Sequence, residues 1–206
     1  MSPVFSTAYL PSIEYFRLLS GFEQITIEQC EHFQKQTMRN RCFILSPNGV
    51  QCLSVPIIHH SGTKQAIKEL KISYASPWQR LHWKTFSTAY NRSPFFEYYV
   101  DEFHHFYVDD KYKWLIDFNM EQLSWILKSI KKNTVVDKTN SFSVMSNDDY
   151  RFISNVKSTE AAVVKQFKTY NQVFVYKYGF MPNLSIIDLI FNTGGRSMDY
   201  LADSLD

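Results

Sequence analysis

The residues with the richest chemistry lie in one stretch, QCEHFQKQTMRNR, at positions 29–41. His32 stands beside Glu31, so a titratable imidazole has a carboxylate as its neighbour. Arginine side chains can hold a carboxylate or a phosphate through two parallel hydrogen bonds. The polar residues that follow the histidine are Lys35, Gln36, Arg39, Asn40 and Arg41. These residue types predict either a site with a general base and an anion-binding arginine or a solvated connection without a function.

Most standard catalytic motifs are missing from the sequence. It contains no G-x-G-x-x-G, Walker, G-x-S-x-G or H-E-x-x-H string, and its six glycines argue against a phosphate-cradling loop. Two adjacent histidine pairs, at positions 59–60 and 104–105, have no cysteine or carboxylate at ligand spacing. Neighbouring residues point apart, so we interpret Asp148 and Asp149 as solvated loop acids rather than a catalytic pair. We therefore predict no metal site and no cofactor.

Strand signals dominate the first third of the chain. Ile25 and Ile27 alternate with polar residues, which is the period of a half-buried strand, and Asn48-Gly49 is a strong hairpin signal. The elements predicted here are strands at residues 4–10, 22–28 and 69–74, a short helix from Ile13 to a stop at Gly21, and a hairpin at residues 42–58. The hairpin and the strand at residues 69–74 together predict a three-stranded meander.

Helix signals dominate the middle of the chain and return at its end. Ser76-Pro77 followed by Gln79 matches a capping box at a helix start. The elements predicted here are helices opening at Ser76, Ser93 and Asn119, a polar loop with at most one short strand at 134–160, a helix at 161–167, a strand at 172–178 and a helix from Ser185 to Gly194. The fold class is therefore mixed α/β (α+β) in one domain, residues 1–206, with an N-terminal strand-helix-strand and β-meander, a helical middle and a C-terminal strand and helix.

The first two predicted strands suggest where a site would form. If they are parallel, their carboxyl ends bring Tyr9 and Pro11 next to residues 29–41, at the sheet edge where open α/β folds bind ligands. Among the aromatic residues of the middle helices, Trp83 alone falls off the apolar face, so it is a candidate for stacking on a sugar ring.

The closing segment, PNLSIIDLIFNTGG at 182–195, has a structural interpretation. Ser185 and Asp188 fit a capping box, and Gly194 fits a helix stop. Asn183 and Ser185 are kept only as neighbours of the predicted site.

Composition excludes several classes of protein. The net charge is only +2, and lysine and arginine are scattered, which argues against a nucleic-acid partner. The three cysteines form no C-x-x-C pair, and no run of 18 apolar residues or export signal is present. We therefore predict a cytoplasmic protein without membrane insertion.

Several linked blocks make the sequence similar to the WbqC-like family, in the form found in Bacteroides-type bacteria. The blocks, in chain order, are TAYLPSIEYF from Thr7, IEQCEHFQKQTMRNRC from Ile27, LSVPI from Leu53, HWKTFSTAYNRSPFFEYY from His82, DFN from Asp117, YNQVF from Tyr170 and GFMPNLSIIDLIFNTG from Gly179. Many members have Gln-Pro where this chain has Thr7-Ala8, so any role of that glutamine does not carry over.

The resemblance implies a role in surface-polysaccharide assembly, because family members occur in O-antigen gene clusters. It suggests a transferase that attaches an amino-acid or other acyl group to a sugar, with glycine and a hexuronic acid as the suggested pair. His32 would be the general base, oriented by Glu28 or Glu31, with His82 as the second candidate. Arg39 and Arg41 would hold a carboxylate or phosphate of the substrate.

Two other hypotheses stay open. The chain could be a non-catalytic module that binds a sugar, a nucleotide sugar or a protein partner through the same residues. Alternatively, residues 31–41 form internal salt bridges only. Under the enzyme hypothesis, Arg39→Ala abolishes turnover and leaves the melting temperature nearly unchanged, whereas under the salt-bridge hypothesis it lowers stability.

Overall fold

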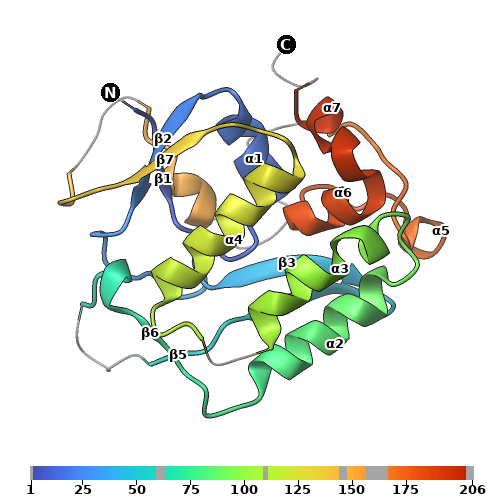
Figure 1. Cartoon of the computed structure of the whole chain (residues 1–206), viewed down its shortest axis with the longest axis horizontal. Helices are drawn as coiled ribbons and strands as arrows, with labels where there is room; N and C mark the ends of the chain where they lie inside the picture. Colours follow the sequence, from blue (N-terminus) through green and yellow to red (C-terminus); the bar gives the residue numbers. More distant parts are fainter. Residues whose placement is uncertain (1, 59–63, 109–110, 144–147, 156–166, 203–206) are drawn as a thin grey trace.

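Three short parallel strands form the sheet on which the site is built (Figure 1). The computed structural model describes residues 2–58, 64–108, 111–143, 148–155 and 167–202. The strands β1 (Val4–Ser6), β2 (Gln24–Glu28) and β7 (Val135–Lys138) lie in the order β1-β2-β7, and β2 is parallel to both neighbours. This confirms the predicted fold class, and the first two strands are parallel.

The chain leaves β1 earlier than predicted. The strand ends at Ser6 rather than at residue 10, and Leu10 has a φ of 42°, which no strand accommodates. The helix α1 (Ile13–Ser20) then connects β1 to β2, and the Ser12 side chain accepts a hydrogen bond from Tyr15 N at its first turn. The loop between β1 and α1 is therefore an irregular connection at the carboxyl end of the sheet.

The predicted hairpin is confirmed, but the meander is wrong. Strands β3 (Arg41–Ser46) and β4 (Gly49–Ser54) pair antiparallel around a turn in which Gly49 has a φ of 99°. The strand expected at residues 69–74 is reduced to Lys71–Ile72, and it pairs with Ile57–Ile58 beyond Pro56 instead of with β4. Pro56 has no N–H to donate and interrupts the chain between β4 and Ile57, so only the short segment after it pairs with Lys71–Ile72. The remaining elements of this region are β5 (Ile57–Ile58), the 3-10 turn η1 (Ile67–Glu69) and β6 (Lys71–Ile72).

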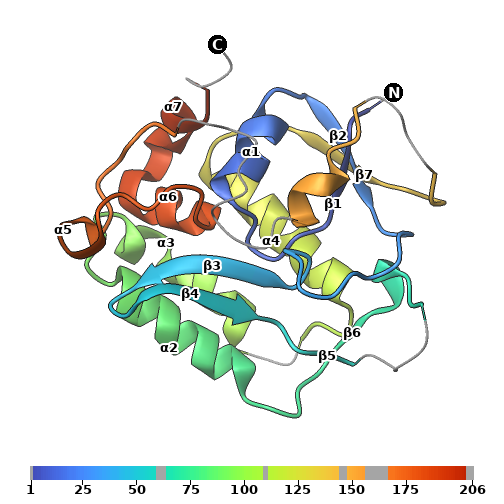
Figure 2. The ribbon, with the colours of Figure 1, turned by 180° about the vertical axis from the view of Figure 1, so that it is seen from behind.

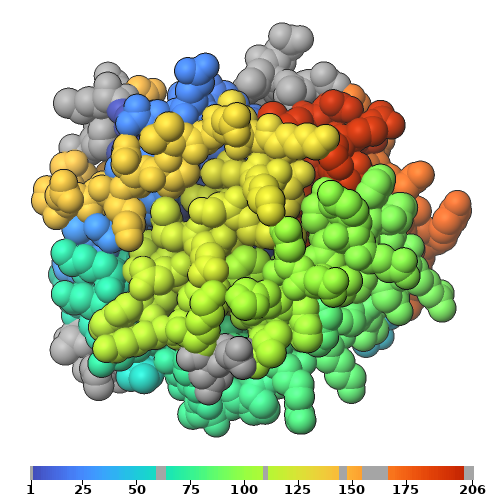
Figure 3. Space-filling view, in the orientation of Figure 1, coloured from blue at the N-terminus to red at the C-terminus, as the bar shows by residue number. Residues whose placement is uncertain are grey.

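Helices from the middle of the chain cover one face of the hairpin, as the opposite views in Figures 1 and 2 show. They enclose an aromatic core in which Phe103 lies 5.2 Å from Phe86 and 5.3 Å from Phe191, measured between ring centroids. The space-filling view shows residues 115–129 at the centre of this face (Figure 3). The elements are α2 (Trp78–Tyr90), α3 (Phe96–His104), the 3-10 turn η2 (His105–Tyr107) and α4 (Leu115–Ser129).

Three predicted helix starts are wrong, and one of them is that of α3, which begins at Phe96 with Phe95 instead of Ser93 at its N-cap. α4 begins at Leu115, one turn before Asn119, whose buried side chain instead donates to Thr7 Oγ1 (3.1 Å) and to the carbonyl oxygen of Arg39 (2.9 Å). Pro77 occupies the N-cap position of α2, and no side chain caps that helix. No described helix is long and apolar enough to span a bilayer.

The strand predicted at 172–178 is also wrong. Its valine, phenylalanine and tyrosine residues favour a strand only beside a partner strand, and here the backbone bonds are local, from Lys177 N to Phe174 O (3.0 Å). The helix predicted at 161–167 falls on residues outside the described part, apart from residue 167. The described elements of this end are the 3-10 turn η3 (Arg151–Asn155), α5 (Val175–Tyr178), α6 (Ile186–Thr193), the 3-10 turn η4 (Gly194–Arg196) and α7 (Ser197–Ala202).

Residues at the start of α6 fasten the C-terminal segment to the loop after β1. Ser185 accepts no capping bond, so the capping-box interpretation is wrong; its Oγ donates to the carbonyl oxygen of Leu10 (2.8 Å). Asn183 Oδ1 accepts from Glu14 N (3.0 Å), and its Nδ2 donates to the Glu14 carboxylate (3.1 Å). These contacts hold the closing segment on the N-terminal loop.

Asp188, the other member of the expected capping box, is a buried core carboxyl. It accepts hydrogen bonds from Tyr170 (2.6 Å) and Gln172 (3.0 Å), and burial raises its pKa. Its role is therefore to join residues 170–172 to α6.

Replacing Asn183 with Ala is expected to lower the free energy of unfolding by about 1–3 kcal/mol, because two buried partners on Glu14 lose their bonds. The φ of 53° at this position also suits Asn better than Ala. Urea unfolding measures the change, with Asn171→Ala as the control because Asn171 is exposed. Equal effects of the two substitutions would contradict this role.

Candidate functional site

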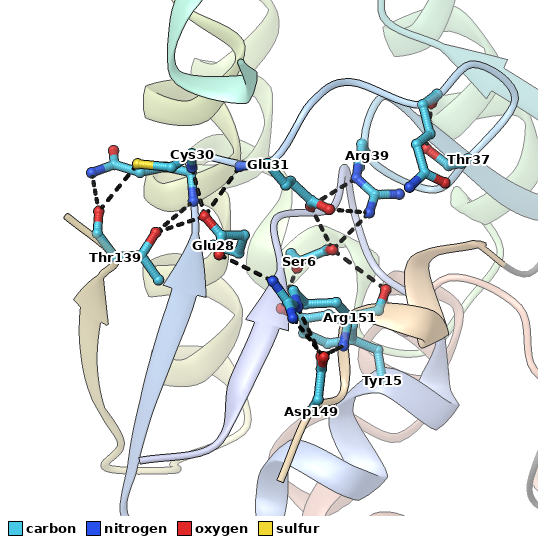
Figure 4. Close-up of polar contacts among 12 residues, drawn as sticks. Ser6, Tyr15, Glu28, Cys30, Glu31, Thr37, Arg39, Thr139, Asp149 and Arg151 are labelled. Atoms are coloured by element: carbon cyan, nitrogen blue, oxygen red, sulfur yellow. Dashed lines mark hydrogen bonds and ion pairs between the residues drawn. The ribbon is translucent and has the colours of Figure 1, made fainter. Parts of the chain in front are cut away.

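A pocket of about 540 Å³ opens at the carboxyl edge of the parallel sheet. Ser6 ends β1 and Glu28 ends β2, and both lie directly beneath this edge (Figure 4). Open α/β sheets bind ligands at such edges, because loops from several strands converge there. The lining residues are Glu31, His32, Phe33, Gln34, Arg39, Lys64, Phe142, Asp149, Arg151 and Phe152.

The Glu31–Arg39 ion pair forms part of the pocket floor. The Arg39 Nε donates to Glu31 Oε1 (2.9 Å) and its Nη2 donates to Glu31 Oε2 (2.7 Å), which is a two-point contact. Ser6 Oγ donates to Glu31 Oε1 (2.6 Å) and accepts from Arg39 Nη2 (2.9 Å). The side chains of Arg39 and Glu31 are only 1% and 7% exposed, so the pair is fixed within the protein.

The Glu28 carboxylate ties together the three segments around the sheet edge. Its Oε1 accepts from Cys30 N (2.6 Å), Glu31 N (3.1 Å) and Thr139 Oγ1 (2.8 Å). Its Oε2 forms an ion pair with Arg151 Nη1 (3.3 Å). All four of these partners belong to the frame around the pocket, so Glu28 holds that frame and does not contact His32.

A second two-point ion pair, between Asp149 and Arg151, closes the other side of the pocket. Arg151 Nε donates to Asp149 Oδ1 (2.9 Å) and its Nη2 donates to Asp149 Oδ2 (2.6 Å). The hydrogen bonds from Arg151 lower the pKa of Asp149. Asp149 is therefore a fixed carboxylate, and its interpretation as a solvated loop acid is wrong.

His32 and Lys64 are the titratable residues of the pocket that remain uncommitted. Both side chains are exposed, and within the described ranges neither one makes a hydrogen bond or an ion pair. The backbone of His32 is held by a bridge to Ala66, so the imidazole is placed at the mouth of the pocket. These two groups are available to a ligand, whereas the charges on the floor are paired.

Tyr9 and His82 lie in a separate buried cluster. The backbone N of Tyr9 donates to Met38 O (2.9 Å), so its loop does border residues 29–41. Its hydroxyl instead contacts His82 Nδ1 (2.9 Å) and the Tyr107 hydroxyl (2.9 Å). Burial lowers the pKa of His82 to about 4, so this imidazole is neutral and enclosed.

Three other predicted binding residues point away from the pocket. Pro11 is buried, and its carbonyl oxygen accepts from Ile186 N (2.8 Å). Asn40 donates to Val55 O (2.9 Å) on the hairpin side, and Arg41 lies in β3. Neither Asn40 nor Arg41 is among the residues that line the pocket, although both follow Arg39 directly in the sequence.

The remaining predicted residues are also outside the pocket lining. Lys35 is exposed beside it, and Trp83 packs on His104 with ring centroids 4.1 Å apart, between α2 and α3. Asn183 and Ser185 are committed to the N-terminal loop, as described above. The pocket thus brings together Glu31, His32 and Arg39 of the predicted set, with Glu28 behind them.

Sequence reasoning missed the part of the pocket lining that comes from Phe142, Asp149, Arg151 and Phe152. Asp149 and Arg151 lie in a weakly patterned polar segment, and only the tertiary fold places them beside β1, where Asp149 bridges Val4. The i, i+2 spacing of an acid and an arginine is too common to indicate a site. The described residues contain no group of three His, Cys, Asp or Glu side chains that could hold a metal ion.

Removing Arg39 is expected to destabilise the protein, contrary to the expectation of an unchanged melting temperature. Arg39→Ala leaves the Glu31 carboxylate buried without its cation, which costs about 3–5 kcal/mol. The double substitution Arg39→Met with Glu31→Leu removes both charges and is expected to cost less than the single one. Chemical denaturation measures both, with Lys111→Ala, which breaks an exposed ion pair, as the control. If Arg39→Ala lowers the free energy of unfolding no more than Lys111→Ala does, the buried ion pair does not stabilise the fold as described.

The buried His82 predicts a pH dependence of stability. Its folded-state pKa of about 4 lies below the ordinary value near 6.5, so the unfolded chain binds more protons between these values. The contribution of His82 to the free energy of unfolding is therefore fully present above pH 6.5. It falls by roughly 3 kcal/mol as the pH drops towards 4. His82→Gln keeps an acceptor for Tyr9 and is expected to flatten this part of the curve. An unchanged slope in urea midpoints between pH 4 and 6.5 would show that His82 titrates normally.

Comparison with known proteins places the chain in a family. Residues 7–164 match the WbqC-like protein family, which is more than half of the chain. The chain is also 24% identical over 217 residues to an uncharacterized protein, Rv1507c, of Mycobacterium tuberculosis, with 94% of each protein covered. No solved structure matches. The chain belongs to the WbqC-like protein family.

Proposed function

We propose that the pocket binds a small sugar derivative that carries an anionic group, and that the protein transfers an amino-acid or other acyl group to or from this sugar. The observation that carries the proposal is that some charged groups of the pocket are paired with each other and others are not. Those on the floor are locked in two-point ion pairs, while the His32 imidazole and the Lys64 ammonium have no polar partner in the described part of the chain.

The paired groups suit the hydroxyl groups of a sugar. The Asp149 side chain is 27% exposed, so its carboxylate can still accept a hydrogen bond from a ligand. Charge-assisted hydrogen bonds of this kind are stronger than neutral ones, and fixed acceptors lose little entropy on binding. The fixed carboxylates of the pocket therefore orient a polyhydroxylated ring through hydrogen bonds.

The unpaired groups suit the anionic part and the reaction. A lysine ammonium is a point charge that attracts phosphate or carboxylate without demanding one geometry. The imidazole of an exposed histidine can accept a proton from an attacking hydroxyl or amino group. Lys64 would thus hold the phosphate or carboxylate of the ligand, and His32 would stand beside it as the general base.

The proposed step is acyl transfer from a preactivated donor such as a thioester. A hydroxyl or amino group of the acceptor attacks the acyl carbon, and its proton passes to His32. The new C–O or C–N bond forms, the bond from the acyl carbon to the donor sulfur breaks, and the thiolate takes up the proton. The family resemblance supports a sugar of surface-polysaccharide assembly as acceptor and glycine as an acyl group to test.

Ligand binding tests the first part of the proposal. Lys64→Ala is expected to weaken the binding of an anionic sugar derivative about fivefold or more, because it removes the unpaired cation. Isothermal titration with UDP-glucuronic acid, glucuronic acid and glucose 1-phosphate measures this, and Lys84→Ala on α2 serves as the control. If none of these compounds binds the wild-type protein, the pocket assignment is wrong.

Product formation tests the second part. Wild-type protein is incubated with UDP-glucuronic acid and glycyl or acetyl thioesters, and mass spectrometry measures the acylated sugar. His32→Ala is expected to lower the rate by a factor on the order of 10² or more while ligand binding persists. His105→Ala is the control, because His105 is exposed and lies outside the pocket lining. Binding without any product would favour a non-catalytic module, and an equal rate in His32→Ala would remove His32 from the mechanism.

A further inference from the structure

The rim of the pocket is aromatic, whereas its floor is charged. Phe142 and Phe152 are 53% and 48% exposed, while Arg39 on the floor is fully buried. Phe95, Phe142 and Phe152 are the exposed phenylalanines of the described residues, and two of these three line this one pocket. Exposed phenylalanines gathered at a polar pocket indicate a surface that a ligand covers.

One of these rings is already held in place by the charge network. The Arg151 guanidinium lies over the Phe142 ring, 4.9 Å from its centroid, and both Asp149 and Glu28 fix that guanidinium. The network therefore supports the ring from one side by a cation–π contact. With half of its surface exposed, Phe142 still has area for a second flat group.

We infer that Phe142 and Phe152 take the nucleobase of a nucleotide-activated ligand, so that the pocket recognises a nucleotide sugar and not a simple sugar phosphate. This inference rests on the proposed function and specifies its substrate class. The base lies against the phenylalanine rim, the phosphate lies at Lys64, and the sugar meets the carboxylates of the floor.

A base fits this rim better than a sugar ring. A sugar ring carries hydroxyl groups around its edge and needs polar side chains beside any aromatic contact, but neither phenylalanine offers a polar atom. A nucleobase presents two flat faces, and every base can stack on an aromatic ring. The pocket carboxylates that can accept hydrogen bonds from sugar hydroxyl groups belong to Glu31 and Asp149, and neither one is part of the phenylalanine rim.

Matched ligands isolate the contribution of the base. Uridine 5′-monophosphate and ribose 5-phosphate share ribose and phosphate and differ in the base, so titration of the wild-type protein with each one compares them directly. The nucleotide is expected to bind about tenfold more tightly. Phe152→Leu and, separately, Phe142→Leu are expected to remove most of this difference and to leave the affinity for ribose 5-phosphate unchanged. Tyr98→Leu is the control, because Tyr98 is 80% exposed and lies outside the pocket lining.

Each contrary result has a distinct meaning. If ribose 5-phosphate binds as tightly as the nucleotide, the stacking inference is overturned while the anion site of the proposed function stands. If glucose 1-phosphate binds as tightly as the nucleotide and both rim substitutions weaken it, the rim takes a sugar ring and the inference is overturned. If no ligand binds to the wild-type protein, both the inference and the proposed function fail.

Discussion

The buried ion pair between Glu31 and Arg39 is the contact on which the rest of the pocket depends. Two charges with almost no exposure are stable only together, because either one alone would be desolvated without compensation. The pair therefore forces the loop between Glu28 and β3 back over Ser6, at the end of β1. That return places His32 at the mouth of the pocket. The rigid floor of the pocket and the accessible imidazole of His32 therefore both follow from this ion pair.

The region around the Glu31–Arg39 ion pair contains many other buried polar groups. Glu28 accepts four bonds from three segments, and Arg151 is shared between Glu28 and Asp149. Hydrophobic residues of similar volume could hold such loops without the desolvation cost. This network of charges lies at the carboxyl edge of a parallel sheet, where open α/β folds bind ligands, which is consistent with the proposed pocket.

The sequence predicted the features that local patterns determine. Alternation at Ile25 and Ile27 predicted β2, and the Asn48-Gly49 turn predicted the hairpin. The parallel pairing of the first two strands, on which the placement of Tyr9 beside residues 29–41 depended, is also present. It could not predict contacts set by distant segments. Asp149 and Arg151 lie more than a hundred residues from Glu28, and Ser185 bonds a loop 175 residues away instead of capping its own helix. Burial of His82, and hence its low pKa, likewise follows from helix packing around it.

A crystal structure of the protein soaked with UDP-glucuronic acid tests the central claim most directly. The account predicts ligand density in the pocket between Lys64 and Arg151, with a phosphate or carboxylate oxygen within hydrogen-bonding distance of Lys64 Nζ and the His32 imidazole facing the sugar. Density for the ligand at another surface, with this pocket holding only solvent at a saturating concentration, would contradict it.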